Sequence, residues 1–171
     1  RHAAAALAVA ERAVAALGIN DGPSYTQLRI GRAGPQVIEV AARLGGGHDA
    51  ELVQAVTGVD LNGLAIDAAL GRARVPPSHG PLVGGAVTRF LVAPAGVLQS
   101  VVVPEGMPGV QQVRTYREPG FVFTPLRRGS DRAGAILAVG DSREEAVARA
   151  DAAAERVRFL IADAGALVQA N

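Results

Sequence analysis

Two short runs of alternating apolar and polar residues lie close together in the first third of the chain. They cover residues 26–30 and 36–41, and the segment between them contains two glycines and a proline. Alternation with a period of two is typical of strands, and glycine and proline favour tight reversals. The pattern therefore predicts a β-hairpin with one apolar face and one polar face.

The predicted hairpin places a glutamine opposite a glutamate. With the turn centred near Ala33, Gln27 faces Glu39, because cross-strand partners are equidistant from the centre of the turn. Alternation then divides the side chains between two faces. The apolar face holds Leu28, Ile30, Ile38 and Val40, and the polar face holds Tyr25, Gln27, Arg29, Val37 and Glu39.

Beyond the second strand, Arg43 continues the polar side of the hairpin, and residues 45–47 are all glycine. Without side chains, these glycines let the backbone come close to a ligand. A carboxylate, an amide oxygen and an arginine together fit Mg²⁺ with phosphate oxygens, because Mg²⁺ takes few protein ligands. The alternative is an exposed ion pair between Glu39 and Arg29, worth about 0.2–1 kcal/mol.

Four segments have apolar residues three and four positions apart, which predicts helices. The first ends near Gly18, two follow the glycine run, and the last lies near the end of the chain. Asp60 and Ser142 are typical N-caps, and Gly58 and Gly71 are typical stops. The apolar positions are Leu7, Val14 and Leu17 in the first helix, Leu61, Leu64, Ala65 and Ala68 in the third, and Val147, Ala150, Ala154, Val157 and Ile161 in the fourth.

A segment rich in proline and glycine, residues 72–85, predicts a linker between two units. Short β runs follow it, separated by turns that contain proline and glycine. They cover residues 87–92, 97–103, 110–117, 121–122 and 133–139. Such close spacing predicts an antiparallel sheet, and the fourth helix is expected to cover it.

Composition limits the chemistry of the chain. Its 171 residues are 49% hydrophobic and carry a net charge of +1, so a packed core is expected, and no nucleic acid or membrane partner is indicated. All 17 basic residues are arginine, which excludes a P-loop lysine and a Schiff-base lysine. Cysteine is absent, which excludes disulfides and thiolate metal sites.

Three further polar features have two interpretations each. His48, at the start of the second helix, either faces solvent or contacts substrate. His79, in the linker, is either an exposed loop residue or a ligand. The charged pairs at residues 127–128 and 131–132 form either a solvated loop or a contact with a nucleotide.

Two segments resemble the C-terminal part of the ATP-grasp domain in carboxylate–amine ligases, particularly the L-amino-acid ligase branch. They are GPSYTQLR, residues 22–29, and IEVAARLGGG, residues 38–47. The second unit, through DSREEA at residues 141–146, is similar to the small domain that follows the ATP-grasp fold in that branch.

The resemblance implies roles for individual residues. Glu39 and Gln27 would hold Mg²⁺ between ATP phosphates, and Arg43 would bind the transferring phosphoryl group as the catalytic residue. Gln27 departs from the usual Glu or Asp, and this loss of a negative charge weakens metal binding. The residues implied to bind ATP or substrate are Tyr25, Arg29, Gly45, Gly46, Gly47 and His48.

The resulting expectation is an α+β chain. Residues 1–80 would form the C-terminal lobe of an ATP-grasp domain, an antiparallel sheet with helices, and residues 81–171 a small α/β sandwich-like domain. Because the chain opens at Arg1 without methionine, we expect a piece of a longer protein that is inactive without its N-terminal lobes.

The expected reaction joins a carboxylic acid, here an amino acid, to an amine through an acyl phosphate, with ATP and Mg²⁺, in the cytoplasm. A homodimer is left open. One alternative is a catalytically silent relative that serves as a nucleotide-binding or interaction module, which Gln27 favours. Another is an ATP-grasp enzyme of purine synthesis or biotin carboxylation, against which the second unit argues.

Overall fold

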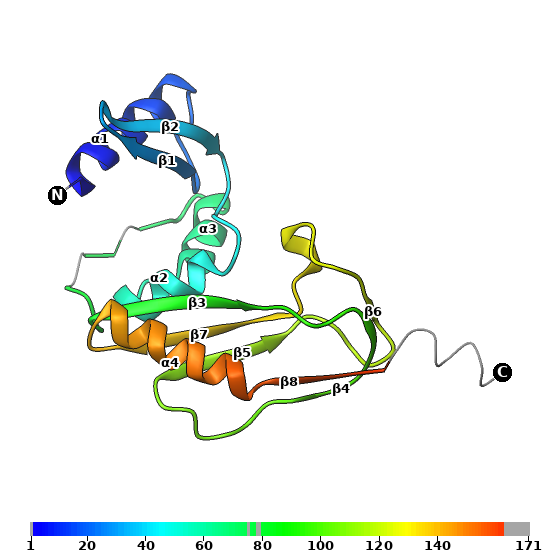
Figure 1. Cartoon of the computed structure of the whole chain (residues 1–171). Coiled ribbons are helices and arrows are strands. Elements are labelled where there is room, and N and C mark those ends of the chain that lie inside the picture. Colours follow the sequence, from blue (N-terminus) through cyan, green and yellow to red (C-terminus); the bar gives the residue numbers. More distant parts are fainter. Residues whose placement is uncertain (1, 75, 78–79, 163–171) are drawn as a thin grey trace. The chain divides into compact units, whose positions relative to one another are not determined.

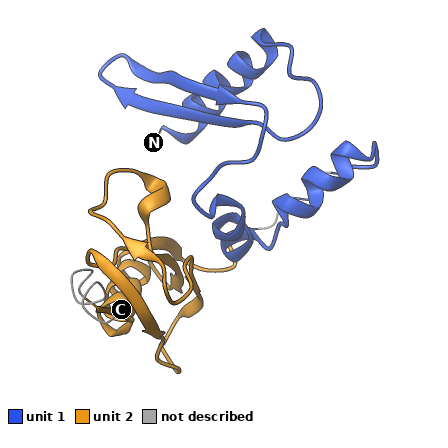
Figure 2. Cartoon of the chain, turned by 90° about the vertical axis from the view of Figure 1, so that its right-hand side faces the viewer, with its two compact units in different colours: residues 1–80 blue, residues 81–171 orange. Residues whose placement is uncertain are grey.

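The computed structural model describes residues 2–74, 76–77 and 80–162 (Figure 1). The chain forms two compact units, Arg1–Gly80 and Pro81–Asn171 (Figure 2). Each unit combines antiparallel strands with helices, which confirms the predicted α+β class. His79 lies outside the described residues. None of the helices within these ranges is long and apolar enough to cross a bilayer.

The first unit consists of a helix on a β-hairpin, followed by two short helices. Its elements are α1 (Ala3–Ala16), β1 (Tyr25–Gly31), β2 (Gly34–Ala41), α2 (Asp49–Thr57) and α3 (Leu61–Ala69). α1 packs against both strands of the hairpin, and α2 packs against α3.

The inner face of α1 differs from the one its leucines suggest. The side chains of Leu7 and Leu17 are 61% and 63% exposed. The half-buried positions are Ala6, Ala8, Val9, Ala10, Ala13 and Val14. Small side chains let the helix backbone approach the sheet closely, so alanine serves as the packing residue here.

The boundaries of α2 and α3 follow the predicted caps. α2 ends at Gly58, whose φ of 75° is the left-handed conformation that glycine adopts without strain. Asp60 then caps α3, because its Oδ1 accepts a hydrogen bond from the Gly63 N–H at 2.9 Å. On α3 the four predicted inner positions are half-buried, whereas Ile66 is 60% exposed.

The second unit contains two three-stranded antiparallel sheets, ordered β3-β7-β5 and β6-β4-β8. One long helix, α4, packs against β3 and β7 (Figure 1). The elements are β3 (Gly85–Leu91), β4 (Gly96–Val102), β5 (Val110–Thr115), β6 (Val122–Phe123), a 3₁₀ turn (Gly129–Asp131), β7 (Gly134–Gly140), α4 (Arg143–Arg156) and β8 (Arg158–Ala162).

The core of this unit lies between β7 and α4. Every residue of β7 is buried, and Ile136 at its centre is fully inaccessible. Ile136 packs in one cluster with Ala150 and Ala153 of α4. The start of α4 is fixed by the predicted cap, since the Ser142 side chain accepts a hydrogen bond from the Glu145 N–H at 3.1 Å.

The prediction that the last helix continues to Ile161 is wrong. α4 ends at Arg156, and residues 158–162 form β8, which pairs with β4. Val157 and Ile161, four positions apart, fit a helical stripe, but together with Phe159 they alternate with a period of two, and valine, phenylalanine and isoleucine favour strands. Within α4 the buried residues are Ala146, Ala150 and Ala153, and the predicted Val147 and Ala154 beside them are half-buried.

Candidate active site on the hairpin

Gln27 lies opposite Glu39 in the β1–β2 ladder, which confirms the predicted pairing. The turn itself is centred between Arg32 and Ala33, half a residue before the centre that this pairing requires. From the turn, the strands pair regularly as far as Leu28 and Val37. If this register continued, Gln27 would lie opposite Ile38. The register shifts at this step, so Ile38 is the extra residue of a β-bulge.

The bulge changes the predicted faces of the hairpin. Directly opposed residues share a face, so Val37 lies with Leu28 on the apolar face and not with Glu39 on the polar one. Ile38 was expected on the apolar face, but it is 61% exposed. The half-buried residues Thr26, Leu28 and Val40 belong to the apolar face, and we infer that α1 covers it.

Arg43 contacts Glu39 from beyond the end of β2. Its Nη2 lies 3.4 Å from Glu39 Oε1, and its Nη1 donates a hydrogen bond to the Leu44 carbonyl at 2.9 Å. The guanidinium carbon also lies 5.8 Å from the centre of the Tyr25 ring. Glu39 forms this ion pair with Arg43 and makes none with Arg29, so the proposed Arg29 pair is wrong.

The Glu39–Arg43 pair is open to solvent. The two side chains are 50% and 58% exposed, and such a pair contributes at most about 1 kcal/mol to folding. Both groups can therefore meet a ligand without breaking the core. Across the described residues no three His, Cys, Asp or Glu side chains gather as a metal cluster.

The glycine run that follows Arg43 has one crowded position and one position with a left-handed backbone. A Cβ on Gly45 would collide with the Asp49 carboxylate and lie 2.7 Å from the Tyr25 ring. Gly47 has a φ of 70°, which favours glycine. Gly46 has open space around it. The absence of a side chain at Gly45 thus lets Tyr25 and the start of α2 come together.

His48 does not face solvent, which corrects one of its two interpretations. Its side chain is only 17% exposed, and its Nδ1 lies 3.3 Å from Glu51 Oε1. Its φ of 70° makes it the one described non-glycine residue with a left-handed backbone. Such a conformation carries a cost and persists where surrounding contacts fix it. No sequence signal pointed to this conformation.

A cavity of about 440 Å³ in the first unit was not expected from the sequence. Apolar side chains of α3 and Leu44 form one part of its lining, and residues 20–23 form another. Neither Glu39 nor Arg43 belongs to the lining, so the cavity is distinct from the polar face of the hairpin.

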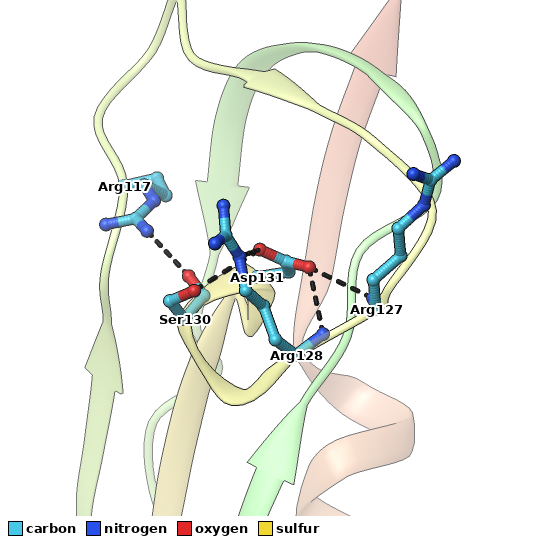
Figure 3. Close-up of polar contacts among 5 residues, drawn as sticks. All are labelled: Arg117, Arg127, Arg128, Ser130 and Asp131. Carbon is cyan, nitrogen blue, oxygen red and sulfur yellow. Dashed lines mark hydrogen bonds and ion pairs between the residues drawn. The ribbon is translucent and has the colours of Figure 1, made fainter.

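In the second unit, Asp131 organises the charged loop of residues 127–132 (Figure 3). Its Oδ2 accepts hydrogen bonds from the backbone N–H groups of Arg127 and Arg128, both at 3.0 Å. These bonds, with the Arg127 amide as the largest cause, hold the pKa of Asp131 below its usual value. Arg117 anchors the same loop, because its Nη2 donates to the Ser130 carbonyl at 2.8 Å.

Comparison with known proteins bears on both units. Residues 89–162 match the family model described as L-amino acid ligase C-terminal domain 2. The L-amino acid ligase from Bacillus licheniformis has a similar structure, with a TM-score of 0.74 and 28% identity, over 88% of this chain and 39% of that one. The chain is therefore similar in structure to ATP-grasp ligases, and its second unit is similar to a domain of the L-amino acid ligases.

Other similarities support the fold. Phosphoribosylglycinamide synthetase from Anaerococcus prevotii has a TM-score of 0.77 at 14% identity, over 89% of this chain and 40% of its own. The biotin carboxylase domain of Hydrogenobacter thermophilus 2-oxoglutarate carboxylase was solved as a dimer with MgADP and bicarbonate. It has a TM-score of 0.63 at 20% identity, over 81% of this chain and 32% of its own.

A relative from Sinorhizobium fredii, uncharacterized protein y4rH, is 34% identical over 148 residues, which cover 82% of this chain. The same alignment covers 30% of that relative. The chain therefore spans about a third of the length of the proteins that it matches.

Proposed function

We propose that this chain supplies part of the phosphoryl-transfer site of an ATP-dependent ligase that joins a carboxylic acid, an amino acid, to an amine. The observation that carries the proposal is the grouping of Gln27, Glu39 and Arg43 on one open face of the hairpin. The match of the second unit to an L-amino acid ligase domain supports the choice of substrates. The proposed site is completed by lobes of the same protein that precede this chain.

The donor set fits Mg²⁺ held mainly by ATP. Glu39 offers a carboxylate and Gln27 an opposed amide oxygen, and Mg²⁺ normally takes one or two carboxylates together with phosphate and water. The Glu39 carboxylate is half exposed and contacts Arg43 through Oε1, so a cation would reach it from solvent. When bound, Mg²⁺ would neutralise charge on the ATP phosphates.

In the proposed reaction, an oxygen of the substrate carboxylate attacks the γ-phosphorus of ATP, and the bond to ADP breaks. The amine nitrogen then attacks the acyl carbon, loses a proton and expels inorganic phosphate. Arg43 would bind the transferring phosphoryl group, since a fixed guanidinium stabilises charge that develops on its oxygens. Tyr25 would hold the Arg43 guanidinium over its ring.

The remaining residues assigned to the site are proposed to bind ATP or substrate. Arg29 lies exposed on the same face as Gln27, two residues along β1, and offers a second positive charge to the phosphates. The backbone of residues 45–47 would approach the intermediate, and His48 would fix the orientation of this segment through its contact with Glu51.

The test is ADP release by the protein that contains this chain together with its preceding lobes, with Mg²⁺ and mixtures of amino acids. Glu39→Gln should lower the rate by at least tenfold, because it removes the carboxylate and keeps the shape. Glu11→Gln, an equal change at an exposed position of α1, is the matched control and should leave the rate unchanged. Equal rates in wild type and Glu39→Gln would refute the role of Glu39.

A further inference from the structure

The second unit carries a local excess of positive charge that the proposed ligase site does not use. Residues 114–132 contain five arginines and two acidic residues, whereas the whole chain has a net charge of +1. Three of these arginines, Arg127, Arg128 and Arg132, lie in the loop of residues 127–132, which we name the arginine loop.

The one carboxylate of the arginine loop is turned toward the backbone. The Oδ2 of Asp131 accepts hydrogen bonds from the backbone amides of Arg127 and Arg128, and the Asp131 side chain is only 20% exposed. Its Oδ1 lies 3.4 Å from the Arg128 Nε, at the limit of a hydrogen bond. Figure 3 shows the Arg127 side chain extending away from Asp131. Asp131 therefore shapes the loop and leaves the outer guanidinium of Arg127 without an acidic partner in the described part of the chain.

Two further arginines hold the loop in place by stacking. The guanidinium of Arg132 lies 3.6 Å from the centre of the Phe90 ring, and that of Arg117 lies 4.6 Å from the centre of the Phe121 ring. Stacking fixes the plane of a guanidinium and leaves its edge free to donate hydrogen bonds. The Arg117 Nε is buried and has no hydrogen-bond partner among the described residues.

Gly129 lies beside the guanidinium of Arg132 and directly follows Arg128 in the chain. A Cβ on Gly129 would lie 3.7 Å from the Arg132 guanidinium carbon, so this guanidinium is beside the tip of the loop. Arg128, the residue before Gly129, has a side chain that is 81% exposed. The arginine loop thus presents exposed guanidinium groups on a backbone that is fixed by hydrogen bonds and ring contacts.

We propose that the arginine loop binds the phosphate groups of an anionic ligand, with Arg127 and Arg128 as the contacts and Arg117 and Arg132 as the residues that position the loop. Guanidinium groups form paired hydrogen bonds with phosphate oxygens, which accounts for the choice of ligand. The site goes beyond the proposed ligase function and does not depend on it.

The test is a calorimetric titration of the 171-residue chain with inorganic tripolyphosphate, without Mg²⁺ and at low salt, which gives the Kd. The double variant Arg127→Gln/Arg128→Gln should raise the Kd by at least about tenfold, since each charge-assisted hydrogen bond is worth about that much. Arg158→Gln, at an exposed position of β8, is the matched control and should keep the wild-type Kd.

The wild type and these variants together show whether Arg127 and Arg128 bind the phosphate groups. No binding by the wild type, an unchanged Kd in the double variant, or an equal loss in Arg158→Gln would overturn the proposal. A second measurement needs no variant: tripolyphosphate should shift the side-chain Nε–Hε resonances of Arg127 and Arg128 in the wild type, and unshifted resonances would overturn the assignment.

Discussion

Gln27 lies opposite Glu39 only because β2 contains one residue more than β1 at this point. The turn alone would pair Gln27 with Ile38, and the bulge at Ile38 brings Glu39 into register instead. A bulge bends a strand and redirects the side chain that follows it. The hairpin thus places an amide oxygen and a carboxylate side by side, with Arg43 3.4 Å from the carboxylate.

Restoring the acid at position 27 tests whether this pair binds a cation. Gln27→Glu adds a second negative charge next to Glu39 and should tighten Mn²⁺ binding by about tenfold, since opposed carboxylates suit a divalent cation better than one carboxylate and an amide. Mn²⁺ binding to the chain is measured by paramagnetic relaxation of water.

Gln36→Glu provides the control for that measurement. Gln36 lies exposed on the same face, opposite Arg29 and nearer the turn. The same change of charge there should alter Mn²⁺ affinity less than twofold. An equal gain in both variants would mean that added charge, not the Gln27–Glu39 pair, attracts the cation.

Gly45 and Gly46 offer a matched pair of substitutions. Gly45→Ala should destabilise the hairpin and the start of α2 by about 1–3 kcal/mol, because the added methyl group meets the Tyr25 ring and the Asp49 carboxylate. Gly46→Ala meets open space and should cost less than about 1 kcal/mol. Amide hydrogen exchange in β1 and α2 measures both; similar protection in the two variants would contradict the packing described around Tyr25.

Arg43 should matter for turnover more than for folding. If the complete protein is the proposed ligase, Arg43→Gln in it should lower kcat by roughly 10²–10³, the range found when a fixed group that stabilises transition-state charge is removed. The thermal midpoint of the chain should change little, because the side chain is 58% exposed. Arg12→Gln, on the exposed side of α1, should change neither quantity. A drop in stability without a drop in kcat would assign Arg43 a structural role.

The lowered pKa of Asp131 leads us to expect that its contribution to folding stability depends on pH. Hydrogen bonds from the Arg127 and Arg128 amides keep its pKa in the folded chain below the usual value of 3.8. The charged form therefore stabilises the folded state above that usual value, and this contribution is lost as the pH falls through the lowered pKa. Asp131→Asn should lower the thermal midpoint at pH 7, and the difference from wild type should shrink below about pH 4.

The control for this pH dependence is Asp21→Asn, an exposed aspartate of the first unit. Its difference from wild type should stay constant across the same pH range. A difference for Asp131→Asn that persists at low pH would show that the lost carboxylate geometry, and not its charge, is responsible.

Much of the hairpin could be predicted from sequence, because alternation and turn residues are local signals. The Gln27–Glu39 pair was predicted correctly, although the bulge at Ile38 was not recognised. The predicted centre near Ala33 lies half a residue beyond the centre of the turn, and this offset gives the same pairing as the bulge does. A bulge depends on how both strands pair, so no single residue reveals it.

Other features depended on contacts that a single sequence does not display. Val157 and Ile161 fit both a helix stripe and a strand, and pairing of residues 158–162 with β4 decides for the strand. His48 adopts a left-handed backbone without the glycine that normally signals it. The crowding of Gly45 against Tyr25 joins residues twenty positions apart, so it became visible only in the folded chain.

The most direct test of the proposed chemistry is whether an oxygen atom of the substrate carboxylate is transferred to inorganic phosphate. The complete protein is incubated with ATP, Mg²⁺ and amino acids whose carboxylates carry ¹⁸O, and the inorganic phosphate released is examined by mass spectrometry. If an acyl phosphate forms, each phosphate takes one labelled oxygen from the carboxylate, and Glu39→Gln should reduce the amount formed. Turnover that yields inorganic phosphate without ¹⁸O would contradict the account.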